Sequence, residues 1–331
     1  MPALATHWLF ARDALNRHSC PPALKRQIAI VSLGAQGPDP LFFHRRIPWR
    51  WRKRSSHDLR SFASACHAGN PRNWLLPPLY FASLPTNPER EKLCALVYGF
   101  FLHYHLDRIV HPYVFSKSGF DETGELSPPW NARHAWFETL LDFAVLEQRG
   151  VHIQAIRPWC MMNLPTMDLL LLDNALSRVF PEQLDEGQYR EACSDMQAVY
   201  HLLHDPFGWK RTVIEKMGKN DTLMAAFVAP QSLSKDLRES VLGLGGDPWP
   251  DPVSGEERRE SFGELYAKAL EELDILNGLW DEEINRSAIS TSLDSWIGTQ
   301  NHDGCQEGVT RHFHAEIPGT SPYSPEADGS V

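Results

Sequence analysis

The chain has 331 residues, of which 42% are hydrophobic and 22% charged, a balance typical of soluble globular proteins. Its formal net charge of −10 argues against a general nucleic-acid binder, because such proteins depend on clustered lysine and arginine. The sequence contains neither an apolar run of about 18 residues nor the basic and apolar regions of a secretory signal. Six scattered cysteines without a C-x-x-C pair indicate free thiols. We therefore expect a cytoplasmic protein without a membrane span.

The predicted elements are helices. Residues 4–16 carry apolar side chains at helical spacing, and residues 23–33 form a second helix that ends at a Gly- and Pro-rich turn. The strongest signals are residues 89–111, expected to stop before Pro112, and residues 131–149. Further helices are predicted at residues 57–67, 164–180, 185–203 and 262–285.

The fold class expected from these elements is all-α, because strand signals are weak. A single domain is predicted over residues 1–286, with a proline-punctuated loop at 70–88. From about residue 287 the chain becomes polar and loses its periodicity. Residues 287–331 are therefore predicted to form a disordered C-terminal tail.

The predicted helix at 89–111 presents metal-ligand side chains along one stripe, four residues apart: His103, Asp107 and His111. The helix at 131–149 repeats the arrangement with His134 and Glu138. One such pair is more often an ion pair or a core histidine than a metal site. Two copies in strongly apolar surroundings favour metal, because buried polar groups need partners. Asp142, one turn beyond Glu138, is a candidate acceptor for the N–H group of a ligand histidine.

Three upstream residues add to this pattern, namely His7, Asp39 and His57. Each alone has an ordinary explanation, as a core histidine, a turn former and an exposed neighbour of a helix cap. In order, the motifs are Thr6-His7, Gly37-Pro38-Asp39, His57, His103-x-x-x-Asp107-x-x-x-His111 and His134-x-x-x-Glu138. This series resembles the zinc-dependent phospholipase C family, which shares its metal arrangement with the S1/P1-type nucleases. The resemblance covers residues 1–142 and implies a multi-helix phospholipase C/P1 nuclease-like bundle with long loops.

The resemblance also implies the ligand sets. One zinc ion would be held by Asp39, His57, His103 and Asp107, and a second by His111, His134 and Glu138. A third would join His7 to a bridging Asp107. Secreted members complete this third site with their mature N-terminal amine, so two zinc ions are expected and the third is left open.

The implied activity is zinc-dependent hydrolysis of phosphodiesters, with a phospholipid head group as the first substrate to consider. Clustered zinc ions acidify a bound water and neutralise charge on the phosphoryl oxygens. The resemblance gives Asp39 a second role as general base toward that water.

Several alternatives stay open. A basic aromatic segment at residues 45–54, which includes Trp49, Arg50, Trp51 and Arg52, could bind an anionic head group, a nucleotide or a membrane surface. It could equally be a solvated loop without a ligand. The chain could also be an HD-type phosphohydrolase keyed on His57-Asp58, or a non-catalytic metal-binding or membrane-surface protein. Nucleic acid is left open as a substrate, and no obligate protein partner is indicated.

Overall fold

The computed structural model describes residues 4–47, 57–84, 89–151, 157–219, 222–286, 288–306 and 308–315. This part of the chain is helical apart from a small antiparallel pair of strands, β1 (Trp249–Pro250) and β2 (Glu257–Arg258). The all-α prediction is therefore confirmed. Among the described helices, none combines the length and the apolar character that crossing a membrane requires.

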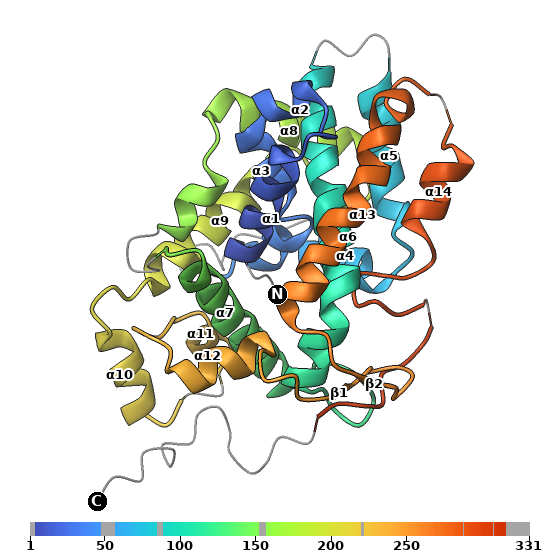
Figure 1. The fold of residues 1–331 in the computed structure, drawn as a ribbon. Helices are drawn as coiled ribbons and strands as arrows, with labels where there is room; N and C mark the ends of the chain where they lie inside the picture. The colour runs from blue at the N-terminus through green and yellow to red at the C-terminus, as the bar shows by residue number, and fades with distance from the viewer. Residues whose placement is uncertain are drawn as a thin grey trace, which may run out of the picture.

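Helix α6 (Arg90–Ser118) runs through the middle of the molecule (Figure 1). Most of its residues are buried, since it contacts helices of both halves of the chain. The prediction that this helix stops at His111 is wrong, because it continues through Pro112 for a further turn and more. A proline removes only one helical hydrogen bond, and here the backbone at Gly304 packs against its ring.

Of the other described helices, several pack directly on α6 and the rest lie outside these. The other helices are α1 (Leu4–Asn16), α2 (Pro22–Arg26), α3 (Ile28–Gly34), α4 (Leu59–Ala68), α5 (Arg72–Ser83), α7 (Trp130–Gln148), α8 (Thr166–Val179), α9 (Gln188–Leu203), α10 (Trp209–Lys216), α11 (Leu223–Ala226), α12 (Lys235–Leu242), α13 (Phe262–Glu283) and α14 (Thr291–Ile297), with 3-10 turns η1 (Asp39–Phe43) and η3 (Pro158–Met162). The helix predicted at 23–33 is in fact two helices, α2 and α3, which break at Gln27.

Helix α5 occupies part of the segment that was expected to be a loop. It carries Pro77 and Pro78 in its interior, which lowers its intrinsic helix propensity. Trp74, Leu75 and Leu79 are nevertheless buried against the core. Tertiary burial therefore overrides local propensity in this segment.

The predicted disordered tail is wrong for residues 288–306 and 308–315, which include a helix and form hydrogen bonds with the rest of the protein. Helix α14 is capped by Ser290, whose side chain accepts a hydrogen bond from the Leu293 N–H. Its Trp296 stacks on His105 of α6 with 4.7 Å between ring centroids. The folded part thus extends well beyond residue 286, and residues 316–331 lie outside the described residues.

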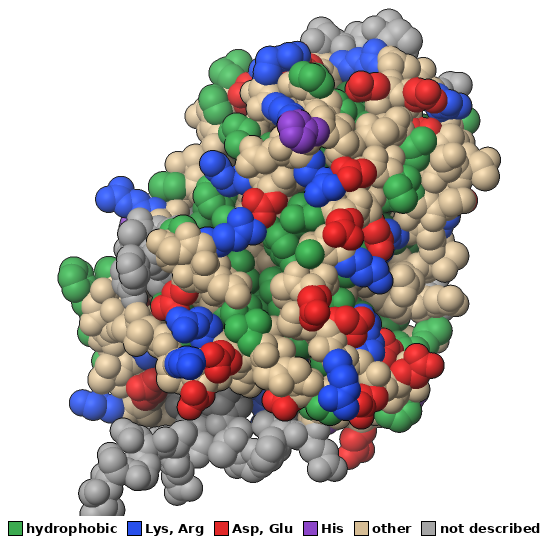
Figure 2. Space-filling model, in the orientation of Figure 1, with side chains coloured by type: hydrophobic (Ala, Val, Ile, Leu, Met, Phe, Trp, Pro, Cys, Tyr) green, Lys and Arg blue, Asp and Glu red, His purple; other side chains and the backbone are tan. Residues whose placement is uncertain are grey.

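The face of the molecule in Figure 2 carries acidic and basic side chains side by side. The negative net charge is therefore not gathered into one patch on this face. Such an arrangement is typical of an ordinary solvated surface.

Helices α3 and α6 touch backbone to backbone. A Cβ atom on Gly99 of α6 would lie 2.6 Å from the carbonyl oxygen of Val31 and from the Cα atom of Gly34, both in α3. Only glycine permits such an approach. The contact holds the turn that follows α3 against the His103 side of α6, where Gly37 packs on the imidazole ring.

We predict that Gly99→Ala lowers the free energy of unfolding by about 1–3 kcal/mol, the usual cost of overpacking a core. Urea denaturation measures this. The matched control is Gly278→Ala in α13, where a Cβ would meet nothing within 4 Å. Since alanine favours helix, that change should stabilise by up to about 1 kcal/mol. Equal stability of the two variants would contradict the close approach.

Candidate metal centre

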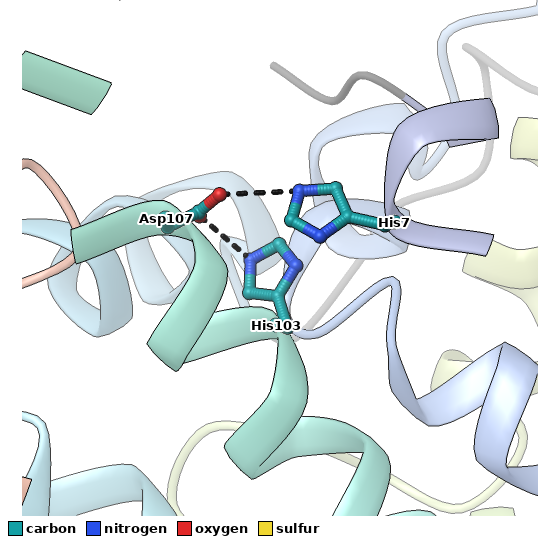
Figure 3. Close-up of side chains that lie close together, drawn as sticks. All are labelled: His7, His103 and Asp107. Carbon is teal, nitrogen blue, oxygen red and sulfur yellow. Dashed lines mark ion pairs between the residues drawn. The ribbon is translucent and has the colours of Figure 1, made fainter. Parts of the chain in front are cut away.

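The structure brings eight ligand-type side chains from α1, η1, α4, α6 and α7 together in the interior. They form three groups whose ligand atoms lie within 4.8 Å of one another: His7, His103 and Asp107; Asp39, His67 and His103; and His111, His134 and Glu138. All are buried except His67, which is half-buried. Figure 3 shows the first group, with His7 reaching from α1 toward His103 and Asp107 on α6.

Asp107 links the three groups. Its Oδ1 lies 3.1 Å from Nε2 of His7 and 3.6 Å from Nε2 of His111. Its Oδ2 lies 3.1 Å from Nε2 of His103 and 4.0 Å from Nε2 of His67. Burial opposes its ionisation, but His103, His111 and His7 hold the pKa of the Asp107 carboxyl well below its usual value. Asp107 is therefore an anion at the centre of the cluster.

Backbone carbonyls orient three of the imidazole rings through Nδ1. The Nδ1 atoms of His67, His103 and His111 lie 2.9, 3.1 and 3.0 Å from the carbonyl oxygens of Ala63, Ala35 and His302, respectively. A carbonyl oxygen only accepts, so each Nδ1 is assigned as the donor. In the neutral ring the opposite nitrogen, Nε2, then carries a lone pair.

Each of these Nε2 atoms faces carboxylate oxygen. That of His67 lies 3.1 Å from Oδ1 of Asp39, and that of His111 lies 3.6 Å from Oε1 of Glu138. A lone pair against an anionic oxygen is unfavourable unless a proton or a metal cation lies between them. Burial lowers the pKa of His103, which favours its neutral, metal-ligating form.

The donor set fits a divalent metal ion. Imidazole nitrogen and carboxylate oxygen are the usual ligands of zinc when thiolates are absent, and they also suit other transition metals. Ligand histidines in metal sites almost always donate their second N–H to a carbonyl or a carboxylate, as three of these do. The buried groups can therefore hold metal ions.

Most of the predicted ligands are in this cluster, but His57 is not. Its Nε2 lies 3.3 Å from Oδ1 of Asp185, and its side chain is partly exposed. Helix α4 starts at Leu59 with Asp58 as its N-cap, so His57 precedes the helix. His67, in the last turn of α4, takes the expected place beside Asp39. The prediction of His57 as a neighbour of Asp39 is corrected to His67.

Asp142 supports the site through the backbone and not through a histidine N–H. Its carboxylate accepts hydrogen bonds from the backbone N–H groups of Ala5 and Thr6 and from the Thr6 hydroxyl, at 2.7–2.9 Å. Burial raises the pKa of Asp142 to about 6. This contact ties the first turn of α1 to α7, and it thereby positions His7.

The C-terminal segment contributes contacts that sequence reasoning missed, because it was expected to be disordered. Besides the His302 carbonyl, Oδ1 of Asp303 lies 3.6 Å from Nδ1 of His111. Arg311 holds the other oxygen of Asp303 at 2.6 Å and donates to the carbonyl of Gly124. The segment therefore fixes the position of the His111 ring.

The predicted substrate-binding residues Trp49, Arg50, Trp51 and Arg52 lie outside the described residues. Arg45, at the start of that basic segment, is described. Its backbone N–H donates to Asp195 at 2.6 Å, and its guanidinium lies 3.2 Å from Glu191. These contacts attach the start of the segment to α9.

No family model, curated protein or solved structure matches this chain. The geometry of the cluster is therefore the main support for a metal site.

We predict that His67→Ala weakens metal binding by at least about 10–100-fold, the loss that removal of even an orienting partner causes. Metal content after competition with a graded chelator measures this. His57→Ala is the control and should bind as the unsubstituted protein does, because His57 lies outside the cluster. The reverse order of effects would show that His57 is the ligand.

Proposed function

We propose that this chain is a metal-dependent hydrolase of phosphodiesters, resembling the zinc-dependent phospholipase C family. The observation that carries the proposal is a buried cluster of five histidines and three carboxylates, in which one carboxylate, Asp107, lies within 4.0 Å of four of the histidines. Structural zinc sites are normally closed by four ligands, whereas adjoining groups that share ligands are typical of catalysis on phosphate esters.

Each of the three ligand groups would hold one ion. Asp39, His67 and His103 would hold one ion, with Asp107 beside them, and His111, His134 and Glu138 a second. His7 with Asp107 and His103 offers a third position. When bound, such ions act as Lewis acids and lower the pKa of water.

Asp39 would take up the proton of the attacking water. Burial opposes its ionisation, but His103 and His67 lower the pKa of its carboxyl, so it is an anion at neutral pH. Its Oδ1 accepts from Nε2 of His67 in the absence of a cation, while Oδ2 lies 3.9 Å from His103. As an anion, Asp39 can orient a water molecule and accept its proton during attack on phosphorus.

The HD-type alternative finds no support in the geometry. His57 pairs with Asp185, and Asp58 caps α4 by accepting from the N–H groups of Arg60 and Ser61. The other alternative, a metal-binding protein without turnover, uses the same cluster. A measurement of phosphodiester hydrolysis distinguishes this alternative from a hydrolase.

We predict turnover of bis(p-nitrophenyl) phosphate that is lost on chelation and restored by added zinc. His134→Ala should lower kcat/KM by at least about 10²-fold, since it removes charge stabilisation of the transition state. His57→Ala is the control and should keep its activity. Full metal occupancy without turnover of any phosphodiester would favour the non-catalytic alternative.

A further inference from the structure

The C-terminal segment, residues 301–306 and 308–315, lies against two of the helices that carry ligand residues. The backbone N–H of His302 donates to the carbonyl of His67 at 3.2 Å, and its own carbonyl oxygen lies 3.0 Å from Nδ1 of His111. The backbone at this one residue therefore joins the end of α4 to the second half of α6.

Arg311 is a buried side chain that links the segment to the rest of the protein. Its Nε and Nη2 atoms donate to the carbonyl oxygen of Gly124 at 2.9 and 2.6 Å, and its Nη1 atom lies 2.6 Å from Oδ2 of Asp303. The other oxygen of that carboxylate, Oδ1, lies 3.6 Å from Nδ1 of His111. A guanidinium is a rigid planar fork, so it holds its two acceptors in a fixed relation to each other.

Gly124 belongs to the connection between α6 and α7, and α7 carries His134 and Glu138. This connection and the C-terminal segment touch backbone to backbone. The φ angle of Gly124 is +82°, and a Cβ atom there would lie 2.7 Å from the carbonyl oxygen of Arg311. Only glycine adopts this conformation freely and permits such an approach. Arg311 therefore bridges the carboxylate that faces His111 and the connection that leads into the helix of the other two ligands.

The ring of Phe115 lies between Arg311 and both histidines of this ligand group. The guanidinium carbon lies 4.0 Å from the ring centroid, which in turn lies 4.8 Å from the centroid of His134 and 5.8 Å from that of His111. A cation over an aromatic face is attracted to it, and more strongly where both are buried. The guanidinium, the phenyl ring and the two imidazole rings thus form one packed unit.

These contacts bear on metal binding because His111 comes from α6, whereas His134 and Glu138 come from α7. An ion can bind all three residues only if the two helices keep a fixed separation. A carboxylate on the second nitrogen of a ligand histidine also orients the ring and makes it a stronger ligand, and Asp303 has this place beside His111. Arg311 supports both conditions, since it holds Asp303 and the connection before α7.

We propose that Arg311 is a positioning residue for the metal ion of His111, His134 and Glu138, and that binding of this ion and docking of the C-terminal segment strengthen each other. Linkage makes the coupling reciprocal. If the docked segment raises the affinity for the ion, the bound ion must stabilise the docked segment by the same factor. This inference rests on the metal-binding part of the proposed function and not on hydrolysis.

The test is a zinc titration in competition with a chromophoric chelator, which gives a dissociation constant for each ion. Arg311→Ala should raise the dissociation constant of one ion by about 10-fold or more, the usual effect of losing an orienting partner. It should leave unchanged that of the ion at Asp39, His67 and His103. Asp303→Asn keeps the size of the side chain and removes its charge, so it should weaken the same ion as Arg311→Ala. It provides the same test if Arg311→Ala does not fold.

Two controls separate positioning from general stability. Arg72 makes matching contacts with the carboxylate and the carbonyl oxygen of Asp294, at 2.7 and 3.0 Å. Arg72→Ala should therefore lower the stability of the protein without weakening the ion that Arg311 supports. In a His134→Ala background that ion is already lost, so Arg311→Ala should have no further effect on zinc affinity.

Hydrogen exchange measures the coupling from the opposite side. The backbone N–H groups of His312, Phe313 and Ala315 donate to carbonyl oxygens outside the segment. Zinc should slow the exchange of these three amides in the unsubstituted protein. It should also slow their exchange in His67→Ala, which removes a ligand of the other group, but not in His134→Ala.

Equal zinc affinities of the unsubstituted protein and Arg311→Ala would overturn this inference, and so would zinc that leaves the exchange of the segment unchanged. Equal weakening of both ions in Arg311→Ala would assign the residue a purely structural role and overturn it as well. An unsubstituted protein that binds no metal would refute the metal centre, and with it the proposed function. Metal binding that depends on Arg311, without turnover of any phosphodiester, would refute only the hydrolase function.

Discussion

The arrangement of imidazole Nε2 atoms against carboxylate oxygens is the constraint on which the rest of the structure depends. His67, His103 and His111 give their Nδ1 protons to backbone carbonyls, so their Nε2 atoms can face Asp39, Asp107 and Glu138 favourably only through protons or metal cations. Buried charges without such partners are too costly for a folded protein. A set of metal ions would satisfy the whole cluster at once.

The fold supplies the rigidity that this cluster requires. Helix α6 carries three of the ligands on one buried stripe, and the glycine contact between α3 and α6 fixes the turn that presents Asp39. Asp142 links α1 to α7 through a hydrogen bond. Asp303, from the C-terminal segment, contacts the His111 ring and helps to fix its position. Ligands from distant parts of the sequence are thus held by backbone contacts, which define their positions more sharply than side-chain packing alone.

The parts of this site that sequence could predict are those set by local periodicity. His103, Asp107 and His111 share a stripe because a helix repeats every 3.6 residues, and the same holds for His134 and Glu138. Whether His57 or His67 lies beside Asp39 depends instead on where α4 begins. Asp58 is the N-cap of this helix, so His57 precedes it and His67 lies in its last turn. The role of Asp142 and the contact of Asp303 with His111 depend on tertiary contacts across more than 130 residues, which no local pattern carries. The C-terminal segment is polar on average, so its composition did not indicate the short apolar face of α14.

The central claim is that metal ions lie between these Nε2 and carboxylate groups. Anomalous diffraction at the zinc absorption edge, from crystals of protein purified without chelator and soaked in zinc, tests it most directly. The account predicts one peak among Asp39, His67 and His103 and another among His111, His134 and Glu138. Absence of any peak within ligand distance of these Nε2 atoms, with the cluster intact, would contradict it.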